Sequence, residues 1–213
     1  MINKIMKSYP LQVFRHKIYL PWRSLLGYFG DIKRGIITQK IIELKDVRVN
    51  PSLSTRFETI SYGHLKSSLT FAKNLEFNKF LDIGCGLGRS LVVAHEVGFA
   101  DLYGVDISID LLQKCRHNMI KSGLSPSLSC SDVADFEIPS GRLAIYLFNP
   151  FGQERMRNLI KKLLLREQET LVIYHNPKHF ECFKDQRIIK TQVWNHFGLY
   201  PEKAFIYLIP SKA

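Results

Sequence analysis

A cluster of glycines with an acid just before it is the part of this sequence best suited to binding a ligand. The stretch Phe80–Ser90 reads FLDIGCGLGRS and contains Gly84, Gly86 and Gly88. Glycines carry no side chain, so a loop built from them brings backbone N–H groups close to a ligand. Asp82 adds a negative charge, which repels a pyrophosphate and attracts a cation. The pattern therefore favours a ligand that carries positive charge.

The spacing of the glycines distinguishes two classes of nucleotide site. Dinucleotide enzymes use G-x-G-x-x-G, in which the third glycine lets the helix pack closely on the strand. Here the third glycine comes one position earlier, and Arg89 stands where the dinucleotide pattern has glycine. The string LDIGCGLG resembles motif I of the class I S-adenosylmethionine (SAM) methyltransferases. The resemblance implies SAM as cofactor, S-adenosylhomocysteine as product, no metal, and Cys85 as part of the cofactor loop.

Two further acids follow apolar strands at suitable distances. Asp106 comes about twenty residues after the first glycine, where an acid can accept hydrogen bonds from the ribose hydroxyls of SAM or NAD. Asp132 follows a third strand, and the resemblance implies that it contacts the adenine amino group. It also places the neighbouring Ile107 and Val133 in the cofactor site. Taken singly, Asp106 could be a helix N-cap and Asp132 a turn residue. Three acids in order on successive strand ends favour a cofactor site.

Asn149, Pro150 and Phe151 follow a fourth apolar strand and are the main catalytic candidates. An Asn oxygen and a carbonyl next to a proline can accept hydrogen bonds from an amine or amide, and an aromatic ring can stack on the acceptor. These residues resemble the (D/N)PP(Y/F) motif IV of amino-methylating family members, although the second proline is missing. The resemblance implies that Asn149 also contacts the cofactor. The alternative interpretation is a turn that ends the strand.

Four side chains outside these motifs are further candidates. His175, after the fifth strand, is a candidate catalytic base for an oxygen acceptor, since a hydroxyl must be deprotonated; His64 is a second candidate base. Tyr62 lies where it could close over the methionine end of the cofactor. Arg89 is either an anion site or an ordinary residue of the first helical turn.

The first 48 residues are the most basic part of a chain of 213 residues with net charge +11, holding ten Lys or Arg against three acids. Six aromatic residues lie among them: Tyr9, Phe14, Tyr19, Trp22, Tyr28 and Phe29. Basic residues mixed with aromatics suit a phosphate-bearing partner, either nucleic acid or lipid-linked, or an anionic membrane surface. A solvated extension that packs its aromatics on the domain is the alternative. We expect residues 1–50 to cap or feed the active site and residues 51–213 to form the SAM-binding domain, with Asn50-Pro51 as the boundary.

Composition limits the class of protein. There is no apolar run of about 18 residues that would cross a membrane, and the first residues lack the apolar core and cleavage site of a signal peptide. The four cysteines form no C-x-x-C pair, so reduced thiols are expected, without a disulfide or zinc site. We expect a cytoplasmic protein, and the basic extension leaves a peripheral position at a membrane surface open.

The order of the expected elements indicates a parallel α/β sheet with helices on both faces. We expect a helix over 54–73, and then, in order, strand 79–83, helix 89–97, strand 102–106, helix 109–121, strands 127–130 and 143–148, helix 153–165 and strand 170–175. The apolar runs 188–194 and 204–209 have no helix between them and form a hairpin. An antiparallel last strand is what the resemblance implies: a Rossmann-like, seven-stranded, mostly parallel sheet. A plain dinucleotide fold would stay parallel.

These observations predict a SAM-dependent methyltransferase. The preferred acceptor is a nitrogen of a protein side chain or nucleobase, because of Asn149-Pro150-Phe151. The first alternative is an O-methyltransferase that acts on a sugar or lipid-linked glycan hydroxyl. A non-catalytic binding module with this fold is a second alternative, and an NAD(P) oxidoreductase is a remote third.

Overall fold

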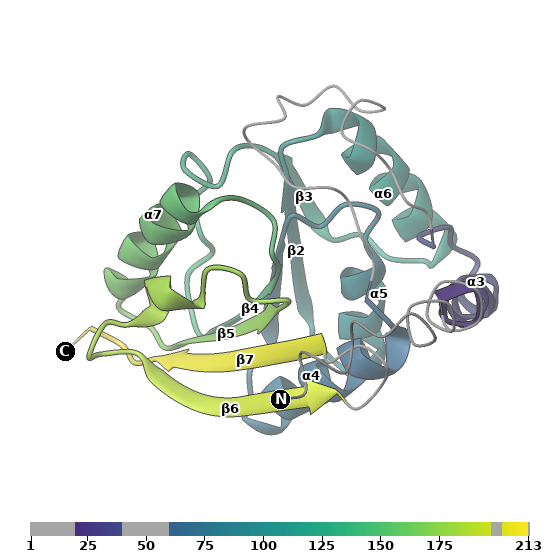
Figure 1. Cartoon of the computed structure of the whole chain (residues 1–213). Helices are drawn as coiled ribbons and strands as arrows, with labels where there is room; N and C mark the ends of the chain where they lie inside the picture. The colour runs from purple at the N-terminus through teal and green to yellow at the C-terminus, as the bar shows by residue number, and fades with distance from the viewer. Residues whose placement is uncertain (1–19, 40–59, 197–201, 213) are drawn as a thin grey trace.

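The computed structural model describes residues 20–39, 60–196 and 202–212. Its centre is a sheet of seven strands in the order β3-β2-β1-β4-β5-β7-β6 (Figure 1). β7 is antiparallel to both of its neighbours, and the other adjacent strands pair in parallel. The strands are β1 (Lys79–Ile83), β2 (Asp101–Asp106), β3 (Ser127–Cys130), β4 (Leu143–Phe148), β5 (Thr170–His175), β6 (Ile189–His196) and β7 (Glu202–Ile209).

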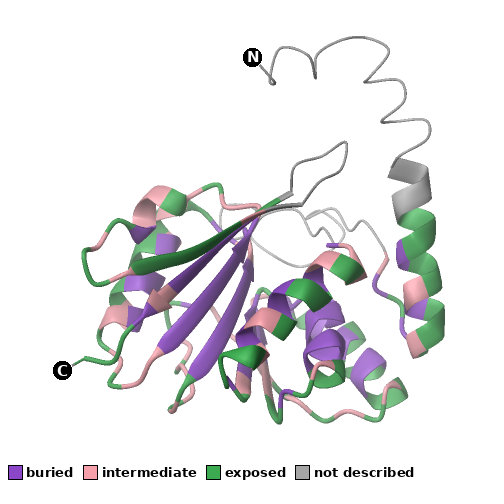
Figure 2. Ribbon diagram, turned by 90° about the horizontal axis from the view of Figure 1, so that it is seen from below, coloured by how far each residue is buried: buried purple, intermediate pink, exposed green. Residues whose placement is uncertain are grey.

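Helices cover both faces of the sheet (Figure 1). The helices of the described residues are α3 (Leu20–Arg34), which stands at the side of the domain, α4 (Tyr62–Asn74), α5 (Arg89–Glu96), α6 (Ile109–Lys121), α7 (Gln153–Leu164) and the 3-10 helix η3 (Phe180–Phe183). One core layer joins α4, α5 and α6 to the sheet, and a second joins α7 and η3 to its other face. β4 and β5 read LAIYLF and TLVIYH and are buried almost throughout (Figure 2), as strands covered on both faces must be.

The sequence predictions of the α/β alternation, the parallel sheet and the antiparallel last strand are confirmed. The first helix of the domain is a correction: it starts at Tyr62, because the side chain of Ser61 accepts a hydrogen bond from the backbone N–H of His64 and caps it. Residues 54–59 of the expected helix, the expected boundary at residues 50 and 51 and the loop of the terminal hairpin lie outside the described residues. Helix α3 was not expected.

Within the described ranges, none of the helices combines the length and the apolar character needed to cross a bilayer. All four cysteines are free thiols, as expected for reduced residues. A hydrogen bond with Cys115, together with burial, raises the pKa of the Cys85 thiol, which therefore stays protonated beside the glycine loop.

Candidate functional site

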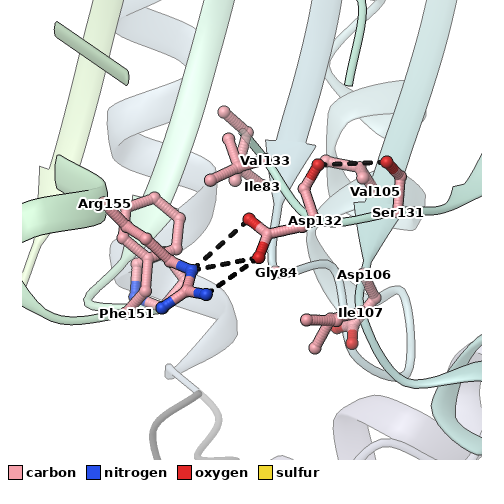
Figure 3. A pocket seen from close by; sticks show the side chains of 11 residues that line it. Ile83, Gly84, Val105, Asp106, Ile107, Ser131, Asp132, Val133, Phe151 and Arg155 are labelled. Atoms are coloured by element: carbon pink, nitrogen blue, oxygen red, sulfur yellow. Dashed lines mark hydrogen bonds and ion pairs between the residues drawn. The ribbon is translucent and has the colours of Figure 1, made fainter. Parts of the chain in front are cut away.

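A cavity opens at the carboxyl ends of β1, β2, β3 and β4, the edge at which parallel α/β sheets bind ligands. Figure 3 shows the residues around it, which combine carboxylates, apolar side chains and glycine backbone. Its lining residues are Ile83, Gly84, Val105, Asp106, Ile107, Ser131, Asp132, Val133, Pro150, Phe151 and Arg155. Seven of the predicted site residues are among them: Gly84, Asp106, Ile107, Asp132, Val133, Pro150 and Phe151.

The glycine loop touches the segment predicted as motif IV. Gly84 and Gly88 have φ angles of +82° and +85°, which side chains rarely tolerate. A Cβ atom added at Gly84 would lie 2.7 Å from the Cβ of Pro150. The backbone N–H groups of Gly84 and Cys85 donate to the Val105 carbonyl at 2.8 and 3.1 Å. Gly84 must therefore be glycine for two reasons, its backbone angle and its contact with Pro150.

Asp106 holds the glycine loop in place. Its carboxylate accepts a hydrogen bond from Gly86 N at 2.8 Å and from Ser108 N at 2.9 Å. Ser108, rather than Asp106, is the N-cap of α6, so the helix-cap interpretation of Asp106 is wrong. Burial raises the pKa of Asp106, against the opposing effect of these N–H donors. Each carboxylate oxygen can accept more than one hydrogen bond, so the group can still accept ribose hydroxyls.

Asp82 lies beside the glycine loop but is not among the residues that line the cavity. It is buried, and the Ser90 hydroxyl at the start of α5 donates to it. Burial raises the pKa of Asp82 to about 7, the Ser90 hydrogen bond opposes this, and the nearby Asp106 adds to it. This carboxyl group is therefore poised to change its charge near neutral pH.

Asp132 has a protein partner already. Arg155 of α7 forms an ion pair with it at 3.0 Å (Figure 3), and Ala134 N donates to it at 3.0 Å. Burial works against ionisation, but these donors hold the pKa of Asp132 below its usual value. Asp132 thus closes one side of the cavity together with a guanidinium, an arrangement that the sequence pattern did not indicate.

Asn149 is buried and adopts the left-handed conformation, with φ of +45°. Its Oδ1 accepts a hydrogen bond from the Tyr174 hydroxyl at 3.2 Å, and that hydroxyl accepts one from His179 N at 3.3 Å. Pro150 and the buried Phe151 line the cavity next to it. The turn therefore exposes Pro150 and Phe151 to the cavity, and Tyr174 orients the amide of the neighbouring Asn149.

Two predicted site residues lie elsewhere. His175 is fully buried on the face of the sheet that α4 covers, where its Nε2 is 3.2 Å from Ser68 Oγ and its ring lies 5.5 Å from that of Tyr146, tilted by 45°. A base in the core, away from the cavity, has no route to an acceptor hydroxyl, so this position does not support the predicted catalytic role. Tyr62 donates its hydroxyl to Asp31, and its ring lies between the guanidinium groups of Arg34 and Arg89.

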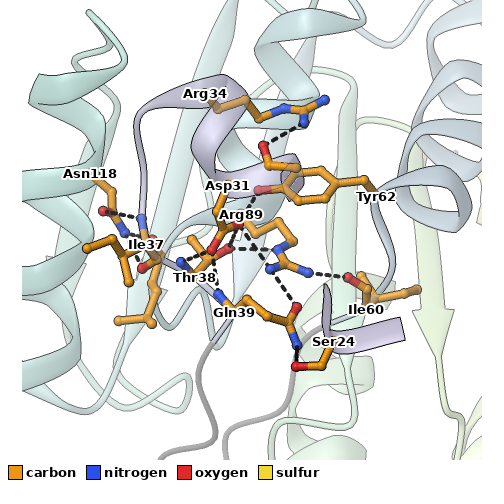
Figure 4. Close-up of polar contacts among 12 residues, drawn as sticks. Ser24, Asp31, Arg34, Ile37, Thr38, Gln39, Ile60, Tyr62, Arg89 and Asn118 are labelled. Atoms are coloured by element: carbon orange, nitrogen blue, oxygen red, sulfur yellow. Dashed lines mark hydrogen bonds and ion pairs between the residues drawn. The ribbon is translucent and has the colours of Figure 1, made fainter. Parts of the chain in front are cut away.

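Arg89 has a role that neither sequence interpretation included. It is buried and donates to Thr38 Oγ1 at 2.7 Å, to the Ile60 carbonyl at 2.7 Å and to Asp31 Oδ1 at 3.1 Å (Figure 4). Asp31 in turn accepts hydrogen bonds from the Thr38 hydroxyl at 2.7 Å and from Gln39 N at 2.6 Å. The network fastens residues 31–39 to the start of α5.

A signal for this network exists in the sequence. A cation in the first turn of a helix is unfavourable, because the helix N-terminus already carries positive partial charge. Arg89 in that place therefore needs an anionic partner, and Asp31 is one of the few acids in a strongly basic region. Because the two residues lie 58 positions apart in the sequence, the sequence alone did not indicate that they form a pair.

Comparisons with known proteins agree with this geometry. Residues 80–164 match a family model described as a methyltransferase domain. These residues therefore form a methyltransferase domain, and the chain has the fold of the class I SAM-dependent methyltransferases. No curated protein matches it in sequence.

Solved structures of the same fold have low sequence identity to this methyltransferase. An RNA methyltransferase from Salinibacter ruber, in complex with S-adenosyl-L-homocysteine, has 18% identity and a TM-score of 0.58 over 74% of this chain and 96% of its own. The ribosomal protein L11 methylase of Lactobacillus delbrueckii subsp. bulgaricus has 18% identity and a TM-score of 0.53 over 70% and 79%. A magnesium protoporphyrin IX methyltransferase from Synechocystis PCC 6803 with bound SAM has 17% identity and a TM-score of 0.54 over 70% and 78%.

The residues of the cavity fit SAM, the family's cofactor. Gly84 presents bare backbone, Asp106 offers carboxylate oxygens, and the apolar side chains of Ile107, Val133 and Phe151 suit a planar base. In the described part of the chain, no group of three or more His, Cys, Asp or Glu residues could hold a metal ion. The expectation that the reaction needs no metal stays a prediction.

Proposed function

We propose that this methyltransferase transfers the methyl group of SAM to a nitrogen atom of a protein side chain or a nucleobase. The observation that carries the proposal is the contact between motif I and the Asn149-Pro150-Phe151 turn, in which Pro150 packs against Gly84. SAM, when bound, supplies an electrophilic methyl group on a sulfonium and leaves as S-adenosylhomocysteine. The residues of the chain must therefore align a nucleophile with that methyl group.

The cofactor site is assigned as follows. Asp106 accepts the ribose hydroxyls, as an acid at this strand end does in nucleotide folds. Ile107 and Val133 flank the adenine, and Asp132, held by Arg155, accepts from its amino group. The glycine loop contacts the methionine part of SAM. Asp82 offers that part a negative charge, directly or through water.

The acceptor site is built on the turn after β4. The carbonyl groups of this turn and the amide oxygen of Asn149 accept hydrogen bonds from the acceptor N–H groups and so orient the nitrogen lone pair. Phe151 offers a ring face for a planar base or an ammonium. Tyr174 is a positioning residue, because its hydroxyl donates to Asn149 Oδ1 at 3.2 Å.

A nitrogen acceptor is preferred to an oxygen acceptor because of where the candidate bases lie. A hydroxyl needs a base that removes its proton, whereas a nitrogen needs mainly an oriented lone pair. His175 is fully buried against α4, and His64, the second candidate base, is not among the residues that line the cavity. The cavity therefore holds neither of the bases predicted for the oxygen alternative. A non-catalytic module is disfavoured because the glycines and the ribose acid are all present.

The basic N-terminal region supports a phosphate-bearing acceptor. Ten Lys or Arg against three acids in the first 48 residues would attract nucleic acid or a lipid-linked substrate. The expectation of a phosphate-bearing acceptor is separate from the expectation of a nitrogen acceptor. Methylation of a nitrogen on a protein without phosphate groups would contradict the first and agree with the second.

The proposal is tested by incubating the protein with radiolabelled SAM and a lysate separated into protein, nucleic acid and lipid-glycan fractions. We expect label in protein or nucleic acid, on nitrogen, as identified by mass spectrometry of the digested product. The Asn149→Gly variant removes the side chain but tolerates the left-handed backbone, and we expect turnover to fall about a hundredfold with SAM affinity kept.

Tyr174→Phe is the matched variant, since it removes only the hydroxyl that orients Asn149. We expect a smaller loss of turnover, about tenfold, and an unchanged dissociation constant of SAM in calorimetry. Label on an oxygen atom would contradict the proposal. So would Asn149→Gly turning over at the wild-type rate.

A further inference from the structure

Helix α3 packs on the domain through its polar side and turns its apolar side outward. Its buried or half-buried positions facing the domain are Gly27, Gly30, Asp31 and Arg34. Its large apolar side chains from residue 24 onward, where the side chains are described, are exposed instead: Leu25, Leu26, Tyr28, Phe29 and Ile32. Figure 2 shows the helix standing at the side of the domain with most of its described surface exposed. This orientation is the reverse of that of an ordinary surface helix.

The contacts on the inner side fix this orientation. A Cβ atom added at Gly30 would lie 2.4 Å from the ring of Tyr62, so only a glycine allows so close an approach. Asp31 is tied to Arg89 by a buried ion pair (Figure 4), and Arg34 to Glu96 at 2.6 Å. Rotating the helix to bury its apolar side would leave a buried Arg89 without its charge partner, which is strongly unfavourable.

The outward side is a continuous apolar arc rather than a set of scattered residues. Positions 25, 28, 29 and 32 share one helix face by the 3.6-residue period. Phe29 and Ile32 are 58% and 57% exposed, and Ile37, just after the helix, is 63% exposed. Contiguous apolar patches of this kind on a monomer usually mark an interaction surface.

The charge around the arc points to an anionic occupant. The one acid of α3, Asp31, is buried and paired, and among the described side chains of the helix the exposed Lys33 places a positive charge at the edge of the arc. Asn118 of α6 bonds the backbone of Ile37, and the exposed Lys114 and Lys121 lie about one turn to either side of it. An apolar, aromatic-containing face with a lysine rim fits a bilayer with anionic headgroups. Nucleic acid would need several Lys or Arg contacts to its phosphates within the face itself, whereas the arc consists of apolar side chains with lysines only around it.

We propose that α3, with Ile37, is a docking surface that binds the methyltransferase to an anionic phospholipid bilayer, the helix lying in the plane of the interface. The apolar arc enters the boundary between headgroups and acyl chains, and the lysines contact the headgroup phosphates. Because Asp31 and Arg89 join α3 directly to the start of α5, the helix would hold the cofactor domain at a fixed orientation to the membrane.

The test is sedimentation of the full chain with vesicles of phosphatidylcholine, with and without phosphatidylglycerol. We expect binding to the anionic vesicles, weakened by salt, and little binding to pure phosphatidylcholine. The variant Phe29→Asp/Ile32→Asp should lower the partition coefficient about tenfold or more. Its SAM affinity should stay that of the wild type, since neither residue lines the cavity.

The control variant is Leu165→Asp/Ile189→Asp, which adds the same charge at positions that are 68% and 50% exposed, at the end of α7 and the start of β6. We expect it to bind vesicles nearly as the wild type does. Equal losses in both variants, or no binding of the wild type to anionic vesicles, would overturn the proposal.

Two other results would also overturn it. One is a dimer in solution that Phe29→Asp/Ile32→Asp converts to a monomer, because the apolar arc would then face a second copy of the chain. The other is binding of RNA or DNA that this variant abolishes while vesicle binding persists. None of these measurements uses methyl transfer, so a failure here leaves the proposed acceptor class untouched.

Discussion

Three buried carboxylates lie near the glycine loop, and Asp31 differs from Asp82 and Asp106 in what balances its charge. Asp31 has a guanidinium, that of Arg89, at 3.1 Å, and although burial opposes ionisation, hydrogen bonds from Tyr62, Thr38 and Gln39 N hold its pKa low. Asp82 and Asp106 have only neutral donors, and burial raises both of their pKa values. Among the described residues, neither forms an ion pair with Lys, Arg or His.

This difference distinguishes a carboxylate with a structural role, Asp31, from two that can bind a ligand, Asp82 and Asp106. A buried charge must be compensated, and if the protein supplies no cation, a ligand can. Asp31 is fully compensated inside the protein, so its role is to attach residues 31–39. Asp82 and Asp106 keep the capacity to accept from a ligand with a positive charge and hydroxyl groups, which SAM has. Similar residue types thus serve two purposes, determined by the partner each one meets.

The largest expected effect is the loss of stability when the buried ion pair of Asp31 and Arg89 is broken. Arg89→Ala leaves Asp31 buried without its cation, and we expect the free energy of unfolding to fall by about 3–5 kcal/mol, measured by chemical denaturation. The double variant Asp31→Leu/Arg89→Met should lose less, because it leaves no unpaired charge.

The matched control for this effect is Arg142→Ala. Its ion pair with Glu169 has side chains 46% and 30% exposed, so water screens it, and we expect a loss of no more than about 1 kcal/mol. If Arg89→Ala and Arg142→Ala cost the same, the Asp31–Arg89 pair does not hold the N-terminal segment.

The next effect concerns the carboxylates that a ligand is expected to compensate. Asp106→Ala removes the acceptor for the ribose hydroxyls and for Gly86 N, so we expect SAM to bind about a hundredfold more weakly in calorimetry. Asp132→Ala should weaken SAM only about threefold, because Arg155 already engages this carboxylate. Equal effects of the two substitutions would mean that the cofactor lies elsewhere in the cavity.

The smallest effect is a pH dependence from Asp82, whose folded pKa of about 7 lies above its usual 3.8. The folded protein without SAM then binds the proton more tightly than the unfolded chain, so this group lowers stability as the pH rises from about 4 to about 7. SAM, being cationic, favours the ionised form. We therefore expect its affinity to fall below about pH 7, by at most about tenfold per unit.

Asp82→Asn cannot ionise and should remove that part of the pH dependence in calorimetric titrations between pH 5 and pH 8. Any slope that remains in this variant belongs to other groups, including the amine of SAM itself. Parallel wild-type and Asp82→Asn profiles would show that Asp82 does not face the positive charge of the cofactor.

Much of the fold could be predicted because it depends on local patterns. Continuous apolar runs such as LAIYLF and TLVIYH predict strands covered on both faces, and the observed β4 and β5 agree. The missing helix between β6 and β7 predicted the antiparallel strand correctly. The start of α4 was harder, because it depends on one hydroxyl, that of Ser61, reaching one backbone N–H.

The candidate site was predictable to the same extent. The glycines and the acids at the strand ends could be placed together, since the carboxyl ends of parallel strands meet at one edge. The side chain of His175 could not, because the alternation along β5 turns Tyr174 toward Asn149 and His175 toward Ser68 on opposite faces. A shift of one residue in the strand would have exchanged their roles.

The sequence by itself determined the fold class and the methyl donor, because backbone angles and strand periodicity are local properties that FLDIGCGLGRS and its neighbours carry. Only the tertiary structure decided which carboxylates are compensated. Asp31 and Arg89 lie far apart in sequence, and their pairing, like the outward apolar side of α3, exists only once the chain is folded. The energy of a charge pair and the burial of a side chain depend on distances in the folded chain. The type of a single residue does not tell which other residues will lie near it.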